Sequence, residues 1–318
     1  MITIVIPNYN GNTYLRQCLD SIYAQRYKDY EVIIIDNAST DGSYTWIGKY
    51  KDITYKQFEK NYGFSRAVNE GIKLAKGEYI LLLNNDTEIC KDFLEEMLRV
   101  IEKDHKIFAV SSKMIQYHNQ NLIDDAGDEY TVIGWPYKRG DGRPINEFER
   151  AERIFSACAG AALYRKEVFD KIGYFDESFF AYMEDVDISY RANIYGYKNV
   201  YAPKAQVYHI GSATSGGRYS EFKLKLSARN SVYVPCKNMP LLQLIINLPC
   251  LVLGMIIKQR VFANKGYGKA YKDGLIEGIK SLKNVNKVPF KIGHLSNYLY
   301  IEWMLIRNTF RYFMLKLK

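Results

Sequence analysis

The sequence lacks the patterns that mark disulfide-bonded and zinc-binding proteins. Its five cysteines are scattered over 318 residues and form no C-x-x-C pair, which argues for reduced thiols and against a structural zinc site. The chain enters a predicted strand from its first residues, without the basic segment and apolar stretch of a secretory signal. We therefore expect a protein on the cytoplasmic side of the membrane.

Glycine-rich phosphate loops are also absent from the first strand-to-helix turn. A dinucleotide-binding domain carries G-x-G-x-x-G there, and a P-loop carries a lysine followed by Ser or Thr after its glycines. This chain has Pro7 to Gly11, PNYNG, instead. A bound nucleotide would need other contacts, and Tyr9 offers a ring that can stack on a base or ribose. An oxidoreductase or nucleotidyltransferase is correspondingly disfavoured.

No apolar run reaches the roughly 20 residues that cross a bilayer. The run 241–257 has 17 residues and contains Gln243, Asn247 and Pro249. We expect a helix, or a broken pair of helices, lying in the membrane interface, with a spanning helix as the alternative. The pattern of 298–317 is basic and amphipathic and suits the same surface. Its alternative is a helical bundle packed on the rest of the chain or on a second copy.

The net charge of +9 is distributed unevenly along the chain. Residues 258–318 contain thirteen Lys and Arg against three Asp and Glu, so the remaining residues sum to about −1. A basic, aromatic tail without a nucleic-acid-binding module indicates an anionic membrane surface and no nucleic acid.

Apolar runs and helical spacing alternate through the first 111 residues. Strands are predicted at 2–6, 30–35, 53–58, 78–83 and 107–111, and helices at 13–24, 43–50, 64–75 and 92–102. Each of the first four strands ends in a polar or glycine-bearing loop. This alternation predicts an α/β fold with a mainly parallel central sheet flanked by helices.

The periodicity is lost between residues 112 and 153. This segment is turn-rich, charged and aromatic, and long irregular segments in compact domains are usually functional or mobile. Trp135 and Tyr137 either cover a sugar or pin the loop to the core. Beyond this segment the expected elements are helices at 167–172, 184–195 and 220–234, strands at 198–201 and 206–208, and a Gly/Ser-rich loop to Gly217.

The strongest candidate site follows the predicted strand 78–83. Asn84, Asn85 and Asp86 lie at its carboxyl end, which is where open α/β sheets bind ligands. Asp86 is a hard oxygen ligand suited to Mg²⁺ or Mn²⁺ beside a phosphate, although these residue types also favour plain turns. Asp36 ends another strand and can accept hydrogen bonds from a base or ribose, or can equally be a helix cap or turn residue.

Two further candidate groups lie late in the chain. Glu184, Asp185 and Asp187 open a predicted helix, and an aromatic stretch containing Phe180 precedes them. This arrangement suits a sugar site with a general base, although the helix dipole alone also explains acids there. His209 follows a strand and precedes a glycine-rich loop, where it can be a metal ligand or a structural histidine.

In sequence order these motifs resemble glycosyltransferase family 2, which has the GT-A (nucleotide-diphospho-sugar transferase) fold, and within it the rhamnosyltransferase-like branch. The resemblance runs from Ile2 to about Asn230. It rests on VIPNYN (5–10), IDNASTDGS (35–43), NYGF (61–64) with Asn69, LNND (83–86), GYFDE (173–177), EDVD (184–187) with Arg191, and His209.

The resemblance implies an inverting glycosyltransferase acting in cell-surface polysaccharide biosynthesis. The implied donor is dTDP-rhamnose or a UDP-sugar, and the implied acceptor is a glycan or a polyprenyl-linked oligosaccharide. A divalent cation, Mg²⁺ or Mn²⁺, would be held by Asp86 and His209, with Asn84 in place of the motif's first acid, and Asp185 would be the general base.

The resemblance also implies which residues contact the nucleotide. The nucleotide-binding set is Pro7, Tyr9, Asn10, Asp36, Asn61, Gly63, Asn85 and Arg191. The aromatic loop and the acidic stretch with its preceding aromatics, rather than the resemblance, give the acceptor-binding set Trp135, Phe180 and Glu184.

These expectations divide the chain into two parts. Residues 1–235 form the catalytic domain, with a nucleotide-binding half (1–112) and an acceptor-binding half (113–235). Residues 236–318 form a helical, basic and aromatic extension that associates peripherally with the inner face of the cell membrane and that also allows a homo-oligomer. The alternative is a non-catalytic module that binds nucleotide-sugars or glycans. Such a module would have lost a base or metal residue, and this sequence retains both.

Overall fold

The structure is a computed structural model that describes residues 1–47, 50, 52–211 and 219–316. The predicted loop up to Gly217 and the end of the predicted helix 43–50 therefore fall mostly outside the described residues. The first half alternates between strands and helices as predicted. Its elements are β1 (Ile2–Asn8), α1 (Asn12–Tyr23), β2 (Tyr30–Asp36), α2 (Tyr44–Ile47), β3 (Ile53–Gln57), α3 (Phe64–Leu74), β4 (Tyr79–Leu83), β5 (Thr87–Ile89), α4 (Phe93–Ile101) and β6 (Ile107–Gln116).

The second half contains more short strands and ends in helices. Its elements are β7 (Ile123–Asp125), β8 (Asp128–Tyr130), β9 (Pro136–Lys138), β10 (Glu152–Ile154), β11 (Ala161–Arg165), α5 (Lys166–Ile172), η1 (Glu177–Phe179), α6 (Glu184–Ile194), β12 (Lys198–His209), α7 (Glu221–Asn238), α8 (Leu241–Asn264), α9 (Gly268–Ser281), η2 (Leu282–Asn284), η3 (Ile292–His294) and α10 (Leu295–Lys316).

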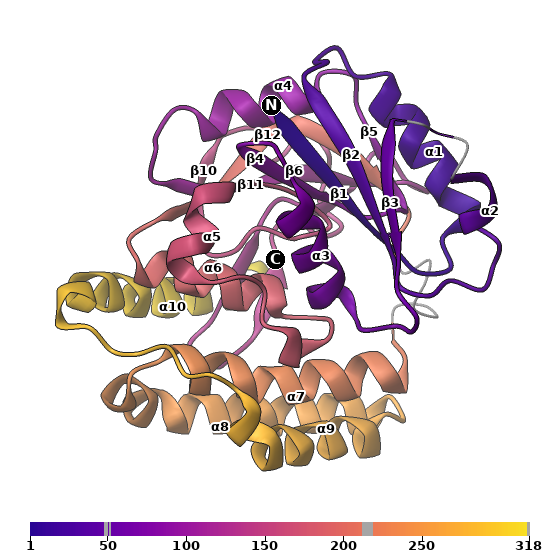
Figure 1. Ribbon diagram of the computed structural model, residues 1–318. Coiled ribbons are helices and arrows are strands. Elements are labelled where there is room, and N and C mark those ends of the chain that lie inside the picture. Colours follow the sequence, from indigo (N-terminus) through magenta and orange to yellow (C-terminus); the bar gives the residue numbers. More distant parts are fainter. Residues whose placement is uncertain (48–49, 51, 212–218, 317–318) are drawn as a thin grey trace.

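One large sheet organises the first two thirds of the chain (Figure 1). Its strand order is β10-β12-β6-β11-β4-β1-β2-β3, with β5 paired to β12 and β7 paired to β6. The strands β4, β1, β2 and β3 are mutually parallel, as are β6 and β12, whereas β11 is antiparallel to both of its neighbours. The prediction of a mainly parallel central sheet is confirmed.

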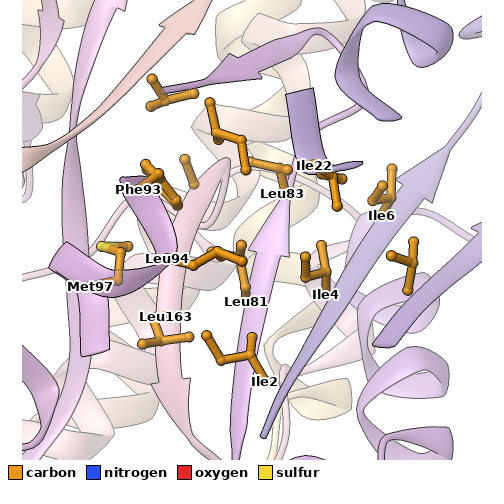
Figure 2. Packing of buried hydrophobic residues seen from close by; sticks show 14 of the residues in the cluster. Ile2, Ile4, Ile6, Ile22, Leu81, Leu83, Phe93, Leu94, Met97 and Leu163 are labelled. Carbon is orange, nitrogen blue, oxygen red and sulfur yellow. The ribbon is translucent and has the colours of Figure 1, made fainter. Parts of the chain in front are cut away.

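Helices cover both faces of this sheet. Ile2, Ile4 and Ile6 of β1 point to the same face as Leu81 and Leu83 of β4, where α1 and α4 pack on them (Figure 2). Alternate residues of the same strands point to the opposite face, which α3, α5 and α6 cover. These strands are apolar at nearly every position because both of their faces are buried.

Three features of the middle of the chain differ from the predictions. The segment 112–153, expected to be irregular, holds the end of β6 and the strands β7, β8 and β9, and β10 begins within it. The two strands expected at 198–201 and 206–208 form the single strand β12, whose pairing with β6 shifts between Ala202 and Gln206 around Pro203. The strand β5, which was not predicted, pairs with the end of β12 and places Thr87 opposite His209.

The C-terminal helices α7, α8 and α9 lie side by side below the sheet, and α10 packs against α6 and β8 (Figure 1). The helix α9 was not predicted individually, and two glycines explain its close approach to α7. A Cβ at Gly274 would lie 2.2 Å from the Lys225 carbonyl oxygen, and one at Gly278 would lie 2.8 Å from that of Arg229. Tertiary packing therefore outweighs the low helix propensity of glycine. The predicted boundary at residues 235 and 236 lies inside α7.

Of the two expected forms, a helix or a broken pair of helices, the structure has the single helix, since α8 runs unbroken through Pro249. Among the described residues, α8 is the one helix long and apolar enough to cross a membrane, and little of it is buried. Its polar Gln243 and Asn247 both donate hydrogen bonds to Glu302 of α10, at 2.7 and 2.8 Å. This pairing holds one side of α8 against the protein and leaves apolar residues on the other side exposed.

Candidate active site

A cavity of about 950 Å³ lies at the carboxyl ends of β1 and β4. It collects most of the predicted site residues, although these come from segments spread over about 200 positions of the sequence. The predicted residues that line it are Pro7, Tyr9, Asn61, Gly63, Asn85, Asp86, Phe180, Glu184, Asp185 and His209. The first strands and the start of α6 thus face one another across a single space.

The Asn-Asn-Asp stretch forms a turn and also lines this cavity. Asn85 donates a hydrogen bond of 2.7 Å to the side chain of Asn8, which ends β1. The backbone oxygen of Asp86 accepts a bond from the amide of Ile210, at 3.1 Å. The turn is therefore fixed to the ends of β1 and β12. A turn and a ligand-binding stretch are thus compatible interpretations of these residues.

His209 and Asp86 lie next to each other because β5 pairs with β12. The distance from His209 Nε2 to Asp86 Oδ1 is 3.6 Å, and that from His209 Nδ1 to Asp124 Oδ2 is 2.7 Å. Burial by itself lowers the pKa of His209, but hydrogen bonds to Asp124 and Asp86 outweigh it and raise the pKa to about 9. Burial opposes ionisation of Asp124 too, yet His209 and Lys138 hold its pKa below the usual range.

This group of side chains fits a divalent cation. A carboxylate oxygen of Asp86 and an imidazole nitrogen of His209 both face the cavity, and such ligands suit Mn²⁺ and similar ions. The other ring nitrogen of His209 is held by Asp124, which is the usual arrangement for a metal-binding histidine. Asp86 and His209 are the residues that would hold such an ion.

The acids that open α6 differ in their surroundings. Burial raises the pKa of Asp185. The backbone amides of Val186 and Ala159, which lie 2.8 and 3.4 Å from its carboxylate, lower this pKa but do not outweigh burial. Burial and the neighbouring Asp185 raise the pKa of Glu184 well above its ordinary value. Both residues line the cavity, and their raised pKa values suit carboxylates that act as bases or hydrogen-bonding groups.

Asp187 and Arg191 have a structural role. Asp187 accepts hydrogen bonds from Arg191, Lys237 and Asn238, at 2.8 to 3.1 Å. Arg191 also donates to the backbone oxygens of residues 172–174 and does not line the cavity. The structure therefore places Arg191 away from the predicted nucleotide contact, in a network that joins α6 to α7.

The backbone before α6 is strained. Phe180, Tyr182 and Met183 all have backbone φ angles between 63° and 70°, which residues other than glycine rarely adopt. Asn230 of α7 stabilises this segment, since its amide donates to the Tyr182 oxygen at 2.7 Å and to two nearby backbone oxygens. Gly63 packs against the same turn, where a Cβ would lie 2.5 Å from the Phe180 oxygen. Cavity-lining residues are thus fixed from two sides.

Three other predicted residues do not line the cavity. Asp36 is fully buried and accepts hydrogen bonds from Asn8 and Ser39, which agrees with its interpretation as a turn residue. Asn10 lies on the surface, where its side chain accepts from the Thr40 amide. Trp135 donates to the Gly254 backbone oxygen of α8 at 3.1 Å, so it pins its loop to the C-terminal helices.

The cavity is also lined by Tyr137, Lys138 and Asp128. Tyr137 was expected to cover a sugar or to pin its loop to the core, whereas Lys138 and Asp128 were not predicted as site residues. Tyr137 and Lys138 come from β9, and Asp128 comes from β8. Burial raises the pKa of Asp128 well above its ordinary value, and the nearby acids Asp125 and Asp185 add to this effect. The sequence offered little signal for Lys138 and Asp128, because three-residue strands show no clear periodicity.

Comparisons with known proteins agree with this fold. The chain is 30% identical over 193 residues to an uncharacterized glycosyltransferase of Rickettsia typhi, a match covering 60% of this chain and 58% of that protein. It is 26% identical over 224 residues to poly-beta-1,6-N-acetyl-D-glucosamine synthase of Staphylococcus epidermidis, covering 69% and 52%. The chain thus spans little more than half the length of these relatives.

Solved structures with the same fold share little sequence. A mannosyltransferase from Pyrobaculum calidifontis, in complex with GDP-Man and Mn²⁺, superposes with a TM-score of 0.55 at 16% identity, over 89% of this chain and 86% of that one. GalNAc-T7 with UDP, GalNAc and Mn²⁺ superposes with a TM-score of 0.59 at 18% identity, over 74% and 48%. These similarities show the GT-A fold.

A family model places the chain more directly. The model described as "Glycosyl transferase family 2" matches residues 3–173, which is more than half of the chain. The matched range contains β1 to β11 and with them the Asn-Asn-Asp turn. The chain belongs to glycosyl transferase family 2.

Proposed function

We propose that this protein is an inverting glycosyltransferase that transfers a sugar from a nucleotide-sugar to a glycan or lipid-linked acceptor. One observation carries the proposal: Asp86 and His209, whose side chains lie 3.6 Å apart, line the same cavity as Asp185. The alternative class is a non-catalytic binding module. The presence of both Asp86 and Asp185 disfavours this alternative.

Asp86 and His209 would hold a divalent cation, Mg²⁺ or Mn²⁺, against the diphosphate of the donor. When bound, the cation would neutralise the negative charge of the leaving nucleoside diphosphate. Asp124 would keep His209 oriented through Nδ1. Tyr9, Asn61, Gly63 and Asn85 lie on the cavity wall where the nucleotide would contact the chain.

Asp185 would act on the acceptor. Its carboxylate takes the proton of an acceptor hydroxyl while that oxygen attacks C1 of the donor sugar, and the bond from C1 to the diphosphate breaks. A single displacement of this kind inverts the configuration at C1 and needs no covalent intermediate. Glu184 and Phe180 lie beside Asp185 in the cavity and would contact the acceptor.

The names of similar proteins support a donor class. A relative named for poly-N-acetylglucosamine synthesis and a structural neighbour containing UDP support a UDP-sugar. The resemblance to rhamnosyltransferases supports dTDP-rhamnose, and we keep it as the second donor. The acceptor would belong to a cell-surface polysaccharide.

The C-terminal helices would place this site at the cytoplasmic face of a membrane. Apolar residues of α8 such as Leu242, Ile245 and Ile246 are more than half exposed, whereas its polar Gln243 and Asn247 are turned toward α10. This asymmetry supports a helix lying on the membrane. Residues 1–235 would form the catalytic part, with its nucleotide and acceptor halves, and residues 236–318 the membrane-binding part.

Calorimetric titration with UDP, dTDP and GDP, each with Mn²⁺ and with EDTA, tests the proposal. We expect one nucleotide to bind in the presence of Mn²⁺ and to lose most of its affinity in EDTA. The matching nucleotide-sugars should then be consumed at a measurable rate, with transfer to a glycan or hydrolysis by water. Failure of all three nucleotides to bind the folded protein would contradict the proposed donor site.

A further inference from the structure

A second cavity, of about 320 Å³, lies beside the candidate active site. It is formed by Tyr137 and Arg139 at the end of the hairpin β8–β9, by Phe148 and Glu152, and by Arg311, Met314 and Leu315 of α10. Tyr137 also lines the larger cavity that contains Asp185. The two cavities therefore share one side chain as a common wall.

This common wall is fixed by the C-terminal helices. The Tyr137 hydroxyl donates to the Asn308 backbone oxygen at 3.3 Å, and the buried Asn308 side chain donates to Glu129 at 2.7 Å. Trp135 is bonded to Gly254 of α8. Since Asn308 and Gly254 belong to α10 and α8, the hairpin that separates the cavities is attached to the helices with the exposed apolar surface.

The lining of the second cavity suits an amphiphilic anion. Phe148, Met314 and Leu315 provide an apolar wall. Arg139 is held by a short ion pair with Glu152. Arg311 is 46% exposed and lies 3.9 Å from Glu129 and 4.0 Å from Glu152, distances longer than those of a hydrogen-bonded pair. Its guanidinium can therefore turn toward a phosphate, which Arg binds with paired hydrogen bonds.

The position of the cavity connects it to the apolar surface. Three apolar side chains near the end of α10 are exposed: Phe313 by 47%, Met314 by 59% and Leu315 by 43%. The cavity thus lies at the exposed apolar end of α10 on one side and at Tyr137 on the other. A molecule anchored in a lipid surface at α10 would reach the candidate active site past Tyr137.

We propose that the second cavity binds the phosphate linkage and the first apolar segment of a lipid-linked acceptor. The Arg311 guanidinium binds the phosphate, the apolar chain lies against Met314 and Phe148, and the sugar lies at Tyr137, the side chain that this cavity shares with the cavity containing Asp185. The inference rests on the proposed function, since it names the site for the lipid part of the acceptor.

Farnesyl diphosphate is a suitable probe, titrated calorimetrically into the protein in EDTA so that the metal-dependent site does not bind diphosphate. We expect saturable binding to the unmodified protein, at least tenfold weaker binding of farnesol and of inorganic pyrophosphate, and at least tenfold weaker binding to Arg311→Gln. Met314→Glu, which places a like charge beside the ligand, should weaken binding as well. Arg26→Gln removes an exposed arginine paired with Asp92 and should bind like the unmodified protein.

The same samples are then titrated with UDP and Mn²⁺, which separates this inference from the proposed function. Retained nucleotide binding with no saturable binding of farnesyl diphosphate overturns the inference alone. So do equal binding by Arg311→Gln and equally tight binding of farnesol, since the latter shows adsorption to an apolar surface only. If UDP, dTDP and GDP all fail to bind, the proposed function fails independently of this test.

Discussion

The two ends of the large cavity carry the same kind of side chain in opposite surroundings. At one end Asp86 and Asp124 flank His209, and Lys138 adds a positive charge next to Asp124. At the other end Asp185 lies beside Glu184, and both have raised pKa values because they are buried. The Asp124 carboxylate, whose pKa His209 and Lys138 lower, suits the orientation of a metal-binding histidine, whereas a carboxylate with a raised pKa beside another acid suits proton transfer.

Asp86→Ala gives the largest expected effect, because it removes a proposed ligand from the first end. Metal-dependent nucleotide binding should be lost, and sugar transfer should fall to background. The measurements are calorimetry with and without Mn²⁺ and a product assay. Thermal unfolding of the variant serves as the folding control, and full Mn²⁺-dependent binding by a folded variant would contradict the assignment.

Asp185→Asn should remove the proposed general base and leave the proposed metal ligands Asp86 and His209 unchanged. Transfer should slow by roughly 10²–10⁴-fold, the usual contribution of a general base. Nucleotide affinity in Mn²⁺ should change little, since Asp185 does not contact Asp86 or His209. An equal loss of nucleotide binding would show that the two ends do not have separate roles.

Asp124→Asn tests whether metal binding by His209 depends on the hydrogen bond between His209 and Asp124. An asparagine can still contact His209 Nδ1 but supplies no charge, so we expect metal affinity to fall by about 10–100-fold. Activity should return at high Mn²⁺ concentration, which it would not do for Asp86→Ala. Asp273→Asn, a substitution of an exposed acid of α9, provides the matched control. Unchanged Mn²⁺ dependence would contradict the proposed orientation of His209.

The smallest effect should appear in the pH dependence of transfer. Asp185 must be ionised to accept a proton, so the rate falls as pH falls through its pKa. Because burial raises that pKa, the acid limb should lie above the value of about 3.9 for a free aspartate. The rate constant is measured at saturating donor and Mn²⁺. The residual activity of Asp185→Asn should lack this limb, and a persistent limb would assign it to another group.

The periodic part of the molecule could be predicted from the sequence, and the contacts around His209 could not. Long apolar strands such as 30–35 and 78–83 identify the sheet, and two separate motifs identify Asp86 and His209. The contact of His209 with Asp124 joins residues 85 positions apart. It depends on β7, which is three residues long and pairs with β6 across a shift in register. Such a strand is too short to leave a periodic signal.

The C-terminal helices show a second limit of sequence analysis. The exposed apolar face of α8 could be predicted from composition. The contact of α8 with the hairpin β8–β9 could not, because it depends on the absence of a Cβ atom at Gly254. A Cβ at Gly254 would lie 2.1 Å from the Ile133 backbone oxygen, so only glycine allows this approach. Nothing in the surrounding sequence distinguishes Gly254 from a glycine that simply interrupts a helix.

The attachment of the hairpin β8–β9 to Asn308 has a consequence for how the protein matures during synthesis. Glu129, Val132 and Tyr137 are translated early, but their partners Asn308 and Thr309 emerge from the ribosome almost 180 residues later. The nascent chain can assemble its sheet and the Asp86 turn well before the hairpin β8–β9 has these partners. In the proposed function, the donor side would thus form first, and the acceptor side would close only when α8 and α10 have been translated.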